Sequence, residues 1–109
     1  MQKKYLELAC SKNNKIADSR IRGCINLGEM YQKGLGVLHS NKKAIEYYKI
    51  ACDLKSAFAC VIIASIYAKG GFDIKQNFSI EKQYAGRACN LGAQEACEAY
   101  KQLNEAGVK

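Results

Sequence analysis

Apolar residues recur along this 109-residue chain at the spacing of helical faces. Two series follow the i, i+3, i+4, i+7 pattern, namely Ala44, Tyr47, Tyr48 and Ala51, and then Cys60, Ile63, Ala64 and Tyr67. The first series predicts a helix that begins near Ser40. The second predicts a helix that ends at Gly70, because glycine readily adopts the positive φ that follows a helix. Small residues such as Ala59 allow close approach, so we expect an antiparallel helical hairpin.

The hairpin pattern occurs three times. The segments that end in the first cysteine of each copy align as YLELAC (5–10), YYKIAC (47–52) and YAGRAC (84–89). The segments that contain the second cysteine align as GCINLGEMYQKG (23–34), ACVIIASIYAKG (59–70) and ACEAYKQLNEAG (96–107). The second cysteines are 36 and 37 residues apart. The repeat units therefore span about residues 1–39, 40–76 and 77–109.

Units of two helices cannot bury their apolar faces alone and are expected to stack around a continuous core. We therefore predict an all-α fold, an α/α solenoid of three helical hairpins that forms a single domain over residues 1–109. In the last unit, Lys101 stands where the earlier units have Gly28 and Ala64, and Asn104 replaces a tyrosine. Polar residues at these positions are typical of a solvent-facing end cap.

The segments NLGEMYQKGLGV and NKKAIEYYKIACDL resemble the Sel-like repeat family, whose α/α units are related to tetratricopeptide repeats. Cysteines at the end of the first helix and the start of the second resemble the cysteine-rich secreted branch known from Helicobacter and its relatives. The resemblance extends over essentially the whole chain. It departs from the family pattern in the third unit, which lacks the LG and the terminal Tyr. It departs also in the first cysteine pair, whose members are 14 residues apart instead of eight.

The six cysteines form matched pairs within the predicted hairpins. A spacing of eight residues can bring the end of one helix and the start of the next within disulfide range across the turn. The expected pairs are Cys52 with Cys60, Cys89 with Cys97 and, by register, Cys10 with Cys24. Zinc binding is the alternative, but the chain has no CxxC or HxxxH motif, and its one histidine, His39, lies alone in a connection. We expect three disulfides, no metal site and a solvent-facing His39.

The formal net charge is +7, and Lys outnumbers Arg by 14 to 3 without basic clusters interleaved with aromatics. We therefore expect no nucleic-acid partner. No apolar run is long enough to span a bilayer, so no membrane span is expected. Paired disulfides imply an oxidising compartment, yet residues 1–10 predict an amphipathic helix and no signal region. We expect a periplasmic or secreted protein in a mature or trimmed form, with import that needs no cleaved signal as the alternative.

Stacked helical hairpins expose an extended curved face, which repeat proteins use to hold a peptide or a partner domain. The first functional hypothesis is a monomeric, disulfide-stabilised scaffold for protein–protein interaction that needs no cofactor. Its partner would be a secreted or envelope protein that it neutralises or adapts. The second hypothesis comes from the resemblance, since some cysteine-rich relatives are described as penicillin-binding proteins or weak β-lactamases.

A serine β-lactamase needs a nucleophilic Ser with a Lys one helical turn later, so that the amine can take the hydroxyl proton. Ser40 with Lys43 and Ser79 with Lys82 have this spacing. Such pairs arise by chance in so lysine-rich a chain, and the companion KTG element is absent. Both serines also suit a helix N-cap. No catalytic residue is therefore assigned.

The first unit carries six more residues than the others between its cysteines, in SKNNKIADSRIRG (11–23). The segment has one acid, Asp18, and is the most basic part of the chain. Its four cations, the candidate binding residues, are Lys12, Lys15, Arg20 and Arg22. A basic loop on a rigid hairpin suits an acidic partner. Neutral drift is the alternative, because surface loops lengthen at little cost in stability.

Overall fold

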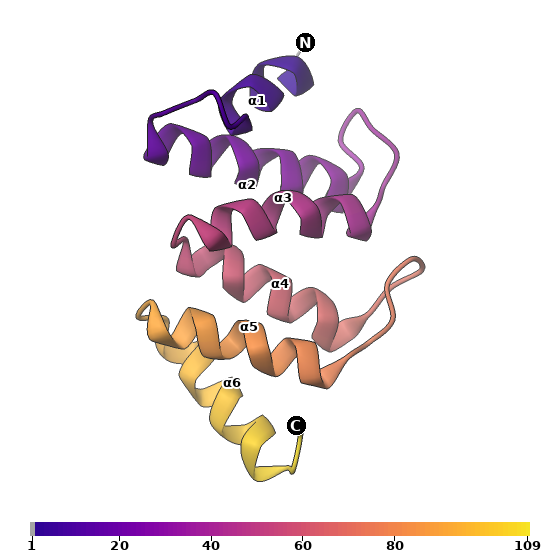
Figure 1. Cartoon of the computed structure of the whole chain (residues 1–109). Helices are drawn as coiled ribbons and strands as arrows, with labels where there is room; N and C mark the ends of the chain where they lie inside the picture. Colours follow the sequence, from indigo (N-terminus) through magenta and orange to yellow (C-terminus); the bar gives the residue numbers. More distant parts are fainter. Residues whose placement is uncertain (1) are drawn as a thin grey trace.

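A computed structural model describes residues 2–109, which form six α-helices and one isolated β-bridge. The helices are α1 (Gln2–Cys10), α2 (Ala17–Lys33), α3 (Asn41–Asp53), α4 (Ala57–Lys69), α5 (Phe78–Asn90) and α6 (Gln94–Glu105). They stack in chain order as three antiparallel hairpins in a molecule 45 Å long and 17 Å thick (Figure 1). The predicted α/α solenoid is confirmed. None of these six helices is long and apolar enough to cross a bilayer.

The solenoid has two edges with different chemistry (Figure 1). The turns within hairpins, at residues 11–16, 54–56 and 91–93, lie along one edge together with the cysteines, and we call it the disulfide edge. The connections between hairpins, at residues 34–40 and 70–77, lie along the other, which we call the connection edge. Each edge therefore carries one kind of loop, repeated along the stack.

Each hairpin is closed by one disulfide, as predicted. The bonds are Cys10–Cys24, Cys52–Cys60 and Cys89–Cys97, with Cα–Cα distances of 4.7, 4.9 and 4.6 Å. The first two pairs are buried, whereas the third is half-buried. All six cysteines are thus bonded, and within residues 2–109 there is no group of three His, Cys, Asp or Glu side chains that could hold a metal ion.

The core runs without a break from hairpin to hairpin. Its largest fully buried side chains include Tyr48, Leu27 and Ile63, one from each of α3, α2 and α4. Alanines that are 0% exposed lie where helices approach closely, and these are Ala44, Ala51, Ala59 and Ala88. The core ends at α6, where Lys101 and Asn104 are exposed as a solvent-facing cap requires.

Short polar side chains cap the starts of three helices, namely Ser40 at α3, Ser56 at α4 and Asn77 at α5. The Ser40 hydroxyl accepts a hydrogen bond from Lys43 N at the start of α3, as expected. Ser79, however, is not an N-cap. Asn77 Oδ1 accepts from Ile80 N at 2.9 Å, and Ser79 is already the second residue of α5.

The extra residues of the first unit do not form one long loop, contrary to expectation. Only residues 11–16 are outside helices, and residues 17–23 extend α2 at its N-terminus. Cys24 is therefore the eighth residue of α2, whereas Cys60 is the fourth of α4. Asp18 in the first turn favours this extension, because a carboxylate near a helix N-terminus interacts favourably with the helix dipole.

Candidate functional site

Two hollows occupy matching positions at the disulfide edge, where consecutive first helices of the hairpins meet. The first pocket lies between α1 and α3 and has a volume of about 290 Å³. Its lining comprises Glu7, Cys10, Ser11, Lys12, Arg20, Tyr47 and Ile50. The second pocket lies between α3 and α5, has a volume of about 190 Å³, and includes Asp53 and Arg87 in its lining. The repeat thus produces the same hollow twice, with different side chains.

The floor of the first pocket is apolar and firmly held. Tyr47 and Ile50 project from one side of α3 and are half-buried against the core. The Tyr47 ring stacks on Tyr31 of α2, with 5.8 Å between ring centroids and 16° between planes. Partial burial, assisted by the neighbouring Tyr31 phenol and by nearby glutamates, raises the pKa of Tyr47 above its ordinary value of 10.0. The phenol therefore stays neutral, and the floor offers an uncharged aromatic surface.

Two cations stand at the rim of this pocket. Arg20 Nε donates a hydrogen bond to the carbonyl oxygen of Cys10 at 3.0 Å, which fixes the guanidinium beside the disulfide. Lys12 is exposed in the turn between α1 and α2. Glu7, on α1, adds one carboxylate to the lining. The rim therefore carries one more positive than negative charge around an apolar floor.

The structure separates the four cations of the predicted binding segment. Lys12 and Arg20 line the first pocket, whereas Lys15 and Arg22 are exposed elsewhere, in the turn and on α2 respectively. Sequence reasoning missed Tyr47 and Ile50, because their helical spacing marked Tyr47 as core and drew no attention to Ile50. The role of the four cations in binding stays a prediction.

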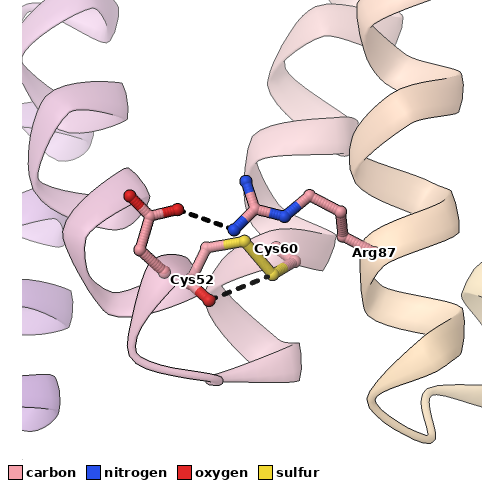
Figure 2. A network of polar contacts seen from close by, with 4 residues as sticks. Cys52, Cys60 and Arg87 are labelled. Atoms are coloured by element: carbon pink, nitrogen blue, oxygen red, sulfur yellow. Dashed lines mark hydrogen bonds and ion pairs between the residues drawn. A yellow bond between two sulfur atoms is a disulfide. The ribbon is translucent and has the colours of Figure 1, made fainter.

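The second pocket shows what a different side chain does at the same place. Arg87 occupies in α5 the repeat position that Ile50 occupies in α3. Its Nη2 lies 2.6 Å from Asp53 Oδ1, and its guanidinium lies 5.3 Å from the Tyr84 ring. Figure 2 shows Arg87 reaching from α5 to the end of α3, beside the Cys52–Cys60 disulfide. An ion pair thus bridges the second pocket, while the first retains its apolar floor.

The two Ser-Lys pairs have structural roles. The Ser40 hydroxyl caps α3 and also donates to Asp73 at 3.4 Å, while Lys43 Nζ lies 5.7 Å from the centroid of the Tyr31 ring. Lys82 Nζ donates at 2.8 Å both to Asn104 Oδ1 and to the carbonyl oxygen of Val108 on the last unit. Both amines contact groups other than their serines, so the β-lactamase alternative is not favoured.

Comparisons with known proteins agree with this architecture. The Sel1 repeat model matches residues 21–56. Among curated proteins, the chain is 30% identical over 96 residues to chitin synthase regulatory factor 3 of Schizosaccharomyces pombe and 27% identical over 103 residues to cytochrome c oxidase assembly factor 7 of Xenopus tropicalis. These alignments cover 88% and 91% of this chain but only 10% and 42% of those proteins.

Two solved structures share the fold. A Sel1 repeat protein from Oxalobacter formigenes superposes with a TM-score of 0.68 at 22% identity, covering 84% of this chain and 69% of that one. The cysteine-rich protein B of Helicobacter pylori superposes with a TM-score of 0.62 at 25% identity, covering 89% and 87%. Sel1 repeats generally mediate protein–protein interaction. The chain therefore contains a Sel1 repeat over residues 21–56, and its fold resembles that of Sel-like repeat proteins, including the cysteine-rich protein of Helicobacter pylori.

Proposed function

We propose that this monomeric scaffold binds an extended, acidic segment of a protein partner across the first pocket. The observation that carries the proposal is an apolar floor of Tyr47 and Ile50 beneath the cations Lys12 and Arg20. An apolar side chain of the partner would lie on the floor, and a neighbouring carboxylate would be held at the rim. Charged contacts at a rim chiefly steer approach, whereas a buried apolar anchor slows dissociation.

The disulfide beside the pocket supports this role by holding the two walls in place. Cys10 lines the pocket, and its disulfide with Cys24 joins α1 to α2. Arg20 donates a hydrogen bond to the Cys10 carbonyl oxygen. A binding site whose walls are already ordered loses less conformational entropy on association. The net charge of +7 also favours the approach of acidic partners. The site is thus preorganised for a partner that must itself become ordered.

The compartment and the class of partner are part of the proposal. Three disulfides and the similarity to a cysteine-rich Helicobacter protein support a periplasmic or secreted location. In that location the partner would be a secreted or envelope protein. Binding one extended segment suits a protein that neutralises such a partner or adapts it to another component.

A displayed library of random peptides tests the proposal. We expect enriched peptides to combine an apolar residue with Asp or Glu. Binding of a selected peptide should be lost in Ile50→Arg, because Arg87 shows that the fold accepts arginine at this repeat position. Lys12→Glu should slow association at low salt and change dissociation little. Surface plasmon resonance measures both rates.

Lys15→Glu is the matched control, because it makes the same charge change in the same turn but away from the pocket. If Lys12→Glu and Lys15→Glu slow association equally, overall charge and not the pocket recruits the peptide. Selected peptides that bind Ile50→Arg as well as the unchanged protein would overturn the proposal.

A further inference from the structure

The connection edge exposes large apolar side chains from two adjacent loops. Leu38 is 90% exposed and Leu35 53% exposed in the connection from α2 to α3, and Phe72 is 73% exposed in the connection from α4 to α5. Single exposed apolar residues are ordinary, and Ile16 and Phe58 are exposed at the disulfide edge as well, but three on two loops that contact each other form a candidate interaction surface. These side chains contribute little to the core, so their presence calls for another physical role.

The two connections are held together rather than free to move separately. The His39 and Phe72 rings lie 4.9 Å apart between centroids. Asp73 accepts hydrogen bonds from Asn41 Nδ2 at 3.0 Å and from Lys42 N at 3.1 Å, which ties the second connection to the start of α3. The loop that carries Leu38 is therefore held against the loop that carries Phe72.

The charge around these side chains is strongly positive. Residues 33–43 contain three lysines and no acid, and residues 69–80 contain two lysines and one acid, Asp73. The Asp73 carboxylate is already occupied by donors at the start of α3. The lysines are Lys33, Lys42, Lys43, Lys69 and Lys75, of which Lys33 pairs with Glu29. The exposed leucines and phenylalanine thus lie in segments of the chain that are rich in lysine.

We propose that the connection edge docks on the surface of an anionic lipid bilayer. Apolar side chains would enter the boundary between headgroups and acyl chains, and the lysines would meet the lipid phosphates. This surface differs from the first pocket, which lies at the opposite edge, so docking does not depend on the proposed peptide binding. Protruding loop tips favour a bilayer over a protein partner, because a bilayer accepts side chains without needing complementary hollows.

Vesicle flotation tests the proposal with two lipid compositions. The protein should float with vesicles of phosphatidylcholine and phosphatidylglycerol in equal parts, and much less with phosphatidylcholine alone. Leu38→Ser with Phe72→Ser should abolish flotation. Lys42→Gln with Lys75→Gln should weaken it by about fivefold for each lysine. Lys12→Gln with Lys15→Gln, at the disulfide edge, is the matched charge control and should change flotation little.

Insertion can be observed directly, because the chain contains no tryptophan. Phe72→Trp should show a blue-shifted emission with anionic vesicles and quenching by brominated acyl chains. Phe58→Trp is the control, since Phe58 is 61% exposed at the start of α4 on the disulfide edge, and its emission should not respond. The absence of flotation, equal loss in the two lysine pairs, or equal quenching of the two tryptophans would each overturn the proposal.

Discussion

Removing the central disulfide should cost more stability than removing the last one. Both bonds close loops of the same length, since each joins cysteines eight residues apart. In the chain-entropy model, each bond stabilises the fold by about 2.6 kcal/mol, because it restricts the unfolded chain. The difference must therefore come from the folded state. Cys52 and Cys60 are 1% and 0% exposed, whereas Cys89 and Cys97 are only half-buried.

Replacing each pair by alanine turns this difference in burial into a difference in free energy. Deleting two buried sulfur atoms leaves a cavity that adds about 1 kcal/mol to the cost at the central pair. We expect losses of about 3.5 kcal/mol for Cys52→Ala with Cys60→Ala and about 2.5 kcal/mol for Cys89→Ala with Cys97→Ala. The larger loss corresponds to a fall in melting temperature of roughly 15 °C for a domain of this size.

Urea denaturation followed by circular dichroism measures both losses in the free energy of unfolding. Native-state reduction gives a second readout, because the half-buried Cys89–Cys97 bond should be the first to become accessible to alkylation, as mass spectrometry would show. An equal or larger loss at the last pair would refute the argument from burial. Negligible losses at both pairs would show that the bonds do not restrict the unfolded ensemble.

Two further predictions concern close packing and charge. Gly28→Ala should destabilise the fold by about 1–3 kcal/mol through overpacking, because a Cβ there would lie 2.8 Å from the buried Tyr48 ring. Gly86→Ala should be nearly neutral in thermal melts, because its Cβ would meet the partly exposed Tyr100 ring at 3.1 Å. Desolvation raises the pKa of Asp73, but hydrogen bonds from Lys42 N and the Asn41 side chain outweigh it and lower the pKa below 3.8. Asp73 should therefore stabilise the fold above its unfolded pKa and lose that contribution as the pH falls through the lower folded value. The free energies of unfolding of the unchanged protein and of Asp73→Asn should thus converge in acid, and a difference that stays constant with pH would contradict this.

The helices and disulfides could be predicted because the same pattern of apolar residues and cysteines occurs in all three repeat units. Apolar residues at helical spacing predicted the buried faces. The recurring cysteine spacing predicted the bonds of the second and third hairpins, and the register of the repeats predicted the first. The end of α2 was equally predictable, since Gly34 follows it with a φ of 71°. Patterns that act within about one helical turn are thus readable from sequence.

Features that depend on distant or competing groups were not predictable. Ser79 and Asn77 are both good N-cap residues, and only the backbone path decides that Asn77 begins α5. Asp73 accepts hydrogen bonds from residues more than 30 positions earlier, and nothing in the repeat pattern indicates that contact. The extension of α2 was missed because a cysteine spacing reports the length of a segment and not its conformation.

The first pocket illustrates why a repeat conceals its functional surface. Alignment on the cysteines emphasises what the units share, and what they share is the core. Ile50 and Arg87 hold the same place in their units, yet one leaves an apolar floor and the other forms an ion pair with Asp53. Because the fold demands little at this half-exposed position, the choice of side chain is available for recognition. The informative positions in such a solenoid are therefore those where equivalent helices differ while their buried neighbours stay alike.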